Sequence, residues 1–249
     1  MKTLALHNLK GGVGKTAAAV NLAYLAAAND VRTLLWDLDP QGAASWYFHG
    51  EPQDCTAKDL LRGPPSTISR LVVPSPYRQL DLVPADFSYR YLDILLRKIE
   101  PPRAALQRLL KPFAGQYRLA VLDCPPSLSH LADNVFSAAD LVAVPVVPTF
   151  LSLRALEQVQ AYFQQEGFDA KKLRPFYSMA DRRRSLHREL LERPPRAMAR
   201  AFKAVIPYAA MVERMGERRA PMAVYAPSED PALLAYAELW LEVSAALAL

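Results

Sequence analysis

Residues 10–16 read KGGVGKT, and this segment combines the residue types that bind phosphate. It follows the apolar residues 4–6 and opens a helix-like stretch, which is the context of a phosphate-binding loop. Glycines let backbone N–H groups surround phosphate oxygens, Lys15 can reach the β- and γ-phosphates, and the Thr16 hydroxyl can ligate Mg²⁺. We therefore predict a nucleotide site that comprises Lys10, Gly11, Gly12, Val13, Gly14, Lys15, Thr16 and Ala17.

Lys10 is unusual in such a loop. The common pattern has a glycine at position 9, where this chain has Leu9, and it needs only one lysine. Because Lys15 already occupies the close approach to the γ-phosphate, Lys10 is hard to place within one subunit. The alternative is a solvent-facing lysine beside the loop.

Three aspartates follow apolar runs that have the character of strands. Asp37 and Asp39 come after residues 34–36, and Asp123 comes after residues 119–122. The spacing of Asp37 and Asp39 points both side chains to one face of a strand. Carboxylates at strand ends can serve a metal ion and a reacting water, or they can cap backbone N–H groups.

Three segments of the chain resemble the ParA/MinD family of ATPases in order and spacing. The KGGVGKT loop is similar to the deviant Walker A motif of that family. Residues 34–42 (LLWDLDPQG) resemble its switch-I block, and residues 119–128 (LAVLDCPPSL) resemble its Walker B and switch-II block. Weaker similarity continues to Pro207 and through residues 220–228. The resemblance covers nearly the whole chain and is closest to ParA/Soj-type members.

The resemblance implies ATP and Mg²⁺ as cofactors and a homodimer that encloses two ATP molecules. In such a dimer Lys10 reaches the nucleotide of the other subunit. Cys124 follows Asp123 where fast ATPases have a glutamate, so slow, partner-stimulated hydrolysis is expected. The implied roles are catalytic for Lys10, Lys15 and Asp39, metal-binding for Thr16, Asp37 and Asp123, and nucleotide-binding for Pro207 together with the loop.

Apolar runs alternate with helix-period segments along the 249 residues. This alternation predicts a doubly wound α/β fold with a mainly parallel sheet covered on both faces, as one P-loop ATPase domain over residues 1–249. Ligands of such sheets bind at the carboxyl ends of the strands. Strands are expected at 3–6, 32–36, 80–83, 119–122, 141–147, 174–179 and 203–206, and helices at 17–28, 89–99, 102–113, 131–138, 153–166 and 231–247.

The positive charge is concentrated between residues 169 and 220, which hold 14 Lys and Arg against 6 Asp and Glu, a net of +8. A basic segment on an otherwise slightly acidic chain suggests a polyanionic partner. In ParA-like proteins the corresponding region contributes to sequence-independent binding of duplex DNA. The alternative is a solvated face. The candidate DNA-binding residues are Arg182, Arg183, Arg184, Arg214, Arg218 and Arg219.

The remaining composition bears on location and partners. No apolar run approaches the roughly 18 residues that a membrane span needs, and no Lys or Arg follows Arg219, so neither a span nor a basic membrane-binding helix is expected. Cys55 and Cys124 lie far apart, which argues against iron–sulfur relatives. We therefore expect a cytoplasmic, nucleoid-associated ATPase without membrane binding.

The expected function is to position or partition a cargo: a chromosome, a plasmid or a protein assembly. A ParB-like or other cargo adaptor would stimulate hydrolysis. Residues 146–151 (VVPTFL) depart from the family pattern at the partner surface, which leaves the adaptor open. The alternatives are a MinD-like spatial regulator and an ATP-dependent metabolic enzyme on the same fold, such as an amidoligase.

Overall fold

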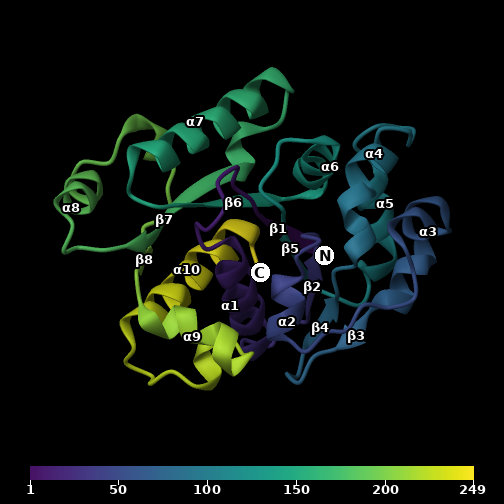
Figure 1. Cartoon of the computed structure of the whole chain (residues 1–249), viewed down its shortest axis with the longest axis horizontal. Helices are drawn as coiled ribbons and strands as arrows, with labels where there is room; N and C mark the ends of the chain where they lie inside the picture. The colour runs from purple at the N-terminus through teal and green to yellow at the C-terminus, as the bar shows by residue number, and fades with distance from the viewer.

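An eight-stranded sheet in the order β3-β4-β2-β5-β1-β6-β7-β8 runs through the middle of the molecule in a computed structural model that describes all 249 residues (Figure 1). Only the edge pair β3–β4 is antiparallel; every other pair is parallel. The predicted doubly wound α/β fold is confirmed. The strands are β1 (Lys2–Leu6), β2 (Thr33–Asp37), β3 (Val73–Pro74), β4 (Leu80–Val83), β5 (Leu119–Asp123), β6 (Leu141–Val146), β7 (Leu173–Ala180) and β8 (Val205–Pro207).

Two hydrophobic cores lie on opposite faces of this sheet. Strands β2, β5 and β6 are buried at every position, because helices cover them on both sides. One core packs α3 (Ala57–Arg62), α4 (Leu92–Leu96), α5 (Ala105–Leu110), α6 (His130–Ala138) and α7 (Phe150–Gln165) against the sheet. The other packs α1 (Lys15–Ala28), α2 (Ala43–Tyr47), α9 (Ala210–Arg218) and α10 (Pro231–Leu247), and Figure 1 shows the two groups on opposite sides of the strands.

Several helices differ from the predictions. The helix expected at 102–113 is shorter, and residues 111–113 around Pro112 form a 3-10 turn. The helix expected at 89–99 begins as a 3-10 turn at Phe87–Tyr91 before α4. Helices α2, α3, α9 and α8 (Ser185–Glu192) were not predicted from the sequence. Each has at most nine residues, which is too short for a stable isolated helix, so they depend on tertiary packing.

None of the helices is both long enough and apolar enough to span a lipid bilayer.

Candidate functional site

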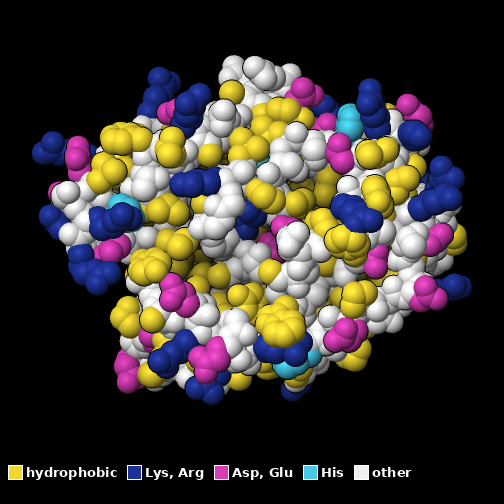
Figure 2. Space-filling model, viewed as in Figure 1, with side chains coloured by type: hydrophobic (Ala, Val, Ile, Leu, Met, Phe, Trp, Pro, Cys, Tyr) yellow, Lys and Arg dark blue, Asp and Glu magenta, His cyan; other side chains and the backbone are white.

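The ends of three central strands bring the predicted residues together. Asp123 ends β5 and pairs in register with Leu6 of β1 and with Asp37 of β2. The chain continues from Leu6 into the loop at 10–16, so the loop and both carboxylates share one edge of the sheet. Figure 2 shows a hollow at the centre of this face, with basic and acidic side chains both visible in it.

The loop at 10–16 holds a conformation that presents its backbone to an anion. Val13 is buried and anchors the loop in the protein, while Gly11 and Gly12 are exposed. Gly12 and Gly14 have φ values of 68° and 90°, which favour glycine. Gly14 begins α1, and no side chain caps the first backbone N–H groups of this helix. These N–H groups and the helix dipole form an anion site.

The two lysines of the loop point to different surroundings. Lys15 is only 8% exposed, and its Nζ lies 3.4 Å from the Lys10 carbonyl oxygen. Burial lowers the pKa of Lys15, and the nearby Asp123 acts in the opposite direction. Lys10 is half-buried and donates from Nζ to Ser152 Oγ of α7 at 3.2 Å. The Lys15 ammonium therefore contacts the phosphate-binding loop itself, whereas the Lys10 ammonium contacts helix α7.

Asp123 has the properties of an unsatisfied metal ligand. It is 1% exposed, and neither carboxylate oxygen has a hydrogen-bond partner. Burial and the neighbouring Asp37 carboxylate raise its pKa well above the usual value. A buried carboxylate without partners is unfavourable, and a cation beside it would relieve this. No group of three or more His, Cys, Asp and Glu is placed to hold a metal ion alone, so Mg²⁺ would also need phosphate oxygens or water.

Asp37 and Asp39 accept hydrogen bonds from nearby backbone N–H groups and so act as capping groups. Asp37 Oδ2 accepts from the backbone N–H and from the hydroxyl of Ser45, both at 2.8 Å, and Oδ1 accepts from the Asp39 N–H at 3.2 Å. Asp39 Oδ1 accepts from the Gln41 N–H at 3.0 Å. Burial raises the pKa of Asp37 to about 6, against these hydrogen bonds. The other carboxylate oxygen of Asp39 is free to accept a hydrogen bond, so Asp39 can cap Gln41 and also orient a water molecule.

Pro207 lies close to the loop although 191 residues separate it from Thr16. A cavity of about 180 Å³ is lined by Gly12 and Gly14 on one side and by Pro207 and Tyr208 on the other. Ser178 lies so close that a Cβ added at Gly14 would be 2.8 Å from its Oγ. The sequence resemblance indicated Pro207 but not Ser178 or Tyr208, because no local pattern marks them.

His7 is a further buried residue that the motifs did not indicate. Its Nε2 lies 2.9 Å from the Ser127 carbonyl oxygen, so the ring joins the end of β1 to the segment after Asp123. Burial lowers the pKa of His7 to about 4, so the ring is neutral at pH 7. His7 therefore connects two motifs without adding charge to the site.

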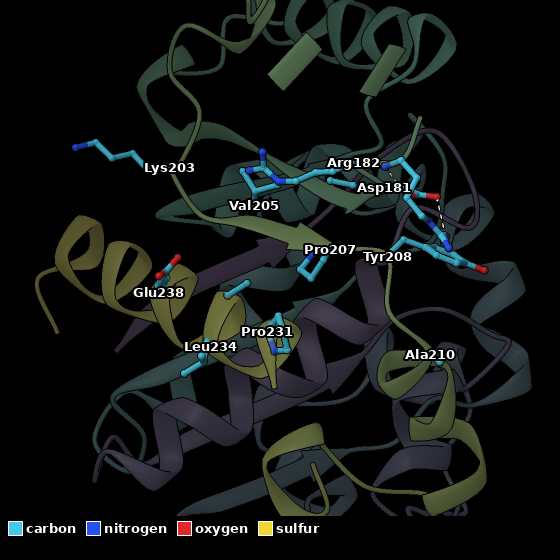
Figure 3. A pocket seen from close by; sticks show the side chains of 13 residues that line it. Asp181, Arg182, Lys203, Val205, Pro207, Tyr208, Ala210, Pro231, Leu234 and Glu238 are labelled. Atoms are coloured by element: carbon cyan, nitrogen blue, oxygen red, sulfur yellow. Dashed lines mark hydrogen bonds and ion pairs between the residues drawn. The ribbon is translucent and has the colours of Figure 1, made fainter. Parts of the chain in front are cut away.

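A larger groove of about 860 Å³ lies on the other side of Pro207, between β8 and α10 (Figure 3). Figure 3 shows the Arg182 side chain extended beside Val205, with Lys203 and Glu238 farther along the groove. Arg183 also lines the groove, and its guanidinium forms an ion pair with Asp181 at 2.9 Å. Basic side chains therefore border the groove.

The predicted DNA-binding arginines fall into two groups. Arg182, Arg183 and Arg184 precede α8, and all three are exposed. Basic side chains gather over α8 at the left edge of Figure 2. Arg214, Arg218 and Arg219 belong to α9 and its end; the first two are exposed, whereas Arg219 is half-buried.

Comparisons with known proteins agree with this geometry. A family model described as an AAA domain matches residues 1–171. The sporulation initiation inhibitor protein Soj of Bacillus subtilis is 30% identical over 251 residues, which cover 98% of both chains. The chain belongs to the ParA/Soj family of P-loop ATPases. The chromosome partitioning protein ParA of Myxococcus xanthus is 35% identical over 161 residues, and the match covers 64% of this chain but only 56% of that protein.

Two solved structures share the fold of this ParA/Soj-family chain. A Borrelia burgdorferi protein described as a plasmid partition protein, with AMPPNP bound, has a TM-score of 0.82 at 21% identity over 97% of both chains. Cobyrinic acid a,c-diamide synthase of Mycobacterium smegmatis, with an ATP analogue and magnesium, has a TM-score of 0.78 at 26% identity. That match covers 98% of this chain and 94% of the synthase chain.

Proposed function

We propose that this ParA/Soj-family chain is an ATP-driven DNA-binding protein that positions or partitions a cargo. Two copies would enclose two ATP molecules, the dimer would bind duplex DNA without sequence preference, and hydrolysis would release it. The observation that carries the proposal is the second lysine, Lys10, which a single phosphate-binding loop does not need. The full-length match to Soj supports the same assignment.

The residues around the loop fit a magnesium nucleotide. The N–H groups at the start of α1 and the Lys15 ammonium would hold the phosphates. The orphaned Asp123 carboxylate, with Thr16 and Asp37 beside it, would hold Mg²⁺ through water, and Mg²⁺ would neutralise phosphate charge. The cavity between Gly14 and Pro207 would take part of the rest of the nucleotide.

The space in front of the loop suits a second copy of the chain. A Cβ added at Gly11 or Gly12 would meet no atom within 4 Å. Lys10 can leave Ser152 by rotating its side chain, because only one hydrogen bond joins its Nζ to the protein. We propose that Lys10 then contacts the nucleotide of the partner copy, where a cation offsets the charge of the reacting phosphate.

Hydrolysis in this arrangement would be slow without a stimulating partner. Asp39 would orient the attacking water through the oxygen that does not cap Gln41. Cys124 stands where a general base would be expected, and burial raises the pKa of its thiol well above the usual value, so it stays protonated. Phe150 and Leu151 are 66% and 70% exposed beside Ser152, and they offer a surface for an adaptor that acts on Lys10.

The basic residues around α8 and α9 would bind DNA phosphates. Arg182 and Arg184 are exposed and form no ion pair, so they are free for phosphate. Arg183 is held by Asp181, and it would have to exchange that carboxylate for a phosphate. Because one copy carries only a few such contacts, joining two copies through ATP would raise the apparent affinity without any new type of contact.

A salt series on random-sequence duplex DNA, with ATP and with ADP, tests this proposal. We expect much tighter binding with ATP than with ADP, and a fall of log affinity with log salt of about 0.9 per phosphate contact. Replacing Arg182 and Arg184 with alanine should weaken binding to every sequence and flatten the salt dependence. The matched control is the pair Arg62→Ala and Arg70→Ala, which removes two exposed charges near α3 at the opposite end of the sheet.

The same assay separates the alternative functions. An ATP-dependent metabolic enzyme, the class suggested by the cobyrinic acid a,c-diamide synthase structure, would show no binding at low salt in the ATP form. A MinD-like regulator would instead bind vesicles with anionic lipid. Binding that ignores the nucleotide, or equal effects of the two double variants, would leave the basic segment as a solvated face.

A further inference from the structure

The end of strand β2 is tied firmly to helix α2. Asp37 accepts two hydrogen bonds from Ser45, and Ser45 Oγ accepts one from the Ala85 N–H at 2.8 Å. Asp37 and Ser45 are both buried, so water does not compete for these hydrogen bonds. A ligand that draws the Asp37 carboxylate toward itself must therefore also move Ser45 or break its contacts.

Trp46 is the next residue of α2, and it joins this helix to α9. Its side chain is 53% exposed, yet three contacts hold it in place. The indole Nε1 donates to the Gly216 carbonyl oxygen at 3.3 Å, and the Arg219 guanidinium lies 3.8 Å from the indole ring centroid. Arg219 Nε also donates to the Trp46 carbonyl oxygen at 3.1 Å. The stacking adds cation–π attraction to the two hydrogen bonds.

The contact with Trp46 holds a residue with left-handed backbone at the end of α9. Arg219 ends α9 with φ 49° and ψ 47°, a left-handed conformation that residues other than glycine adopt rarely. Such a conformation persists only where the surroundings hold it. The exposed Arg214 and Arg218 precede it on the same helix. Trp46 therefore holds the C-terminal end of α9, next to Arg218, whereas the start of the helix is held separately by the Tyr225 hydroxyl, which donates to the Met211 carbonyl oxygen at 2.6 Å.

We propose that Trp46 is a positioning residue that couples the nucleotide site to α9. When Asp37 contacts a bound magnesium nucleotide, the movement would pass through Ser45 and Trp46 to Arg219, and it would change the orientation of the arginines of α9. The path runs from Asp37 through Ser45 to Trp46 and then to Arg219, and every step is a contact within one chain. This inference rests on the proposed DNA binding, and it adds a route by which nucleotide acts on α9 besides dimer formation.

Tryptophan fluorescence tests the first part of this path without DNA. The chain has three tryptophans, and Trp36 and Trp240 are 1% and 4% exposed, so a neutral quencher such as acrylamide reports on Trp46. We expect MgATP to change the quenching of the wild-type chain, and to leave that of Trp46→Phe unchanged. Arg219→Ala should increase quenching before nucleotide is added, because the guanidinium covers one face of the indole.

DNA binding tests the second part. Trp46→Ala should keep the affinity for MgATP, but it should reduce the ratio of DNA affinities with ATP and ADP by about tenfold, a typical coupling between sites. Trp46→Phe keeps a ring under Arg219 and should restore most of this ratio. Tyr91→Ala, which removes an aromatic residue of 47% exposure from the other end of the sheet, is the matched control.

The outcomes separate the two proposals. A wild-type chain that binds no DNA overturns the proposed function, and the quenching experiment still decides whether nucleotide reaches Trp46. Quenching that MgATP leaves unchanged overturns the inference whatever the DNA assay shows. If Trp46→Ala has the same ratio of DNA affinities with ATP and ADP as the wild-type chain, the inference is overturned as well.

Discussion

Two glycines of the phosphate-binding loop are expected to respond differently to replacement by alanine: Gly14→Ala should lower the stability of the fold, and Gly11→Ala should weaken ligand binding or dimerisation. Gly14 has a φ of 90°, and a Cβ at this position would lie 2.8 Å from Ser178 Oγ. The left-handed conformation costs roughly 1–2 kcal/mol for alanine, and the close contact with Ser178 Oγ adds a similar amount, so Gly14→Ala should destabilise the chain by roughly 2–4 kcal/mol. For a chain of this size the melting temperature should fall by roughly 4–16 °C.

Gly11→Ala should leave the stability of the fold almost unchanged and should affect binding instead. Its φ is not in the left-handed region, and an added Cβ would meet no atom within 4 Å, so Gly11→Ala should change the free energy of unfolding by less than about 0.5 kcal/mol. The open space in front of Gly11 is where we place phosphate or a second copy of the chain. Gly11→Ala should therefore weaken MgATP binding or ATP-dependent dimerisation at least about tenfold, or 1.4 kcal/mol.

Calorimetry and nucleotide titration on both variants decide between these expectations. Ser178→Ala in the Gly14→Ala background should recover the part of the loss that comes from the contact with Oγ, but not the part that comes from φ. An unchanged melting temperature in Gly14→Ala would show that the chain does not keep this loop conformation in solution. Normal nucleotide binding and dimerisation in Gly11→Ala would refute the placement of ligand or partner in front of the loop.

Three further outcomes follow from the site. Lys15→Ala should abolish ATP binding, whereas Lys10→Ala should spare most of it and remove ATP-dependent dimerisation or hydrolysis; light scattering with nucleotide titration distinguishes them, and equal loss of ATP affinity would place Lys10 in its own subunit's site. Asp39→Ala should still bind MgATP and accumulate as a dimer, with hydrolysis slowed by roughly 10²–10⁴-fold, and wild-type turnover would assign the water to another group. Burial raises the pKa of Asp37 to about 6, so the native chain binds this proton more tightly than the unfolded chain, and the free energy of unfolding should fall as pH rises from about 4 to about 6. Urea unfolding of wild type and Asp37→Asn should show a difference that grows by up to roughly 3 kcal/mol across this window, and a constant difference would contradict the raised pKa.

The sequence was sufficient for the parts of the site that lie within contiguous motifs. The loop at 10–16 and the strand ends at Asp37 and Asp123 follow apolar runs, and parallel strands align their carboxyl ends at one edge, so their meeting could be predicted. The long helices α1, α7 and α10 could be predicted as well, because each is an uninterrupted run of at least 14 residues that consists mostly of good helix formers.

Contacts between distant segments were decided only by the tertiary structure. The stack of Arg219 on Trp46 joins residues 173 positions apart, and the cavity between Gly14 and Pro207 depends on how β8 packs beside the loop. Helices α8 and α9 were not predicted although each separates apolar from charged side chains, because segments of 8 and 9 residues are too short to tell such a pattern from a charged loop. A motif specifies what its own backbone and side chains can bind, whereas the partners that hold those side chains come from other elements, whose approach depends on the packing of the whole sheet.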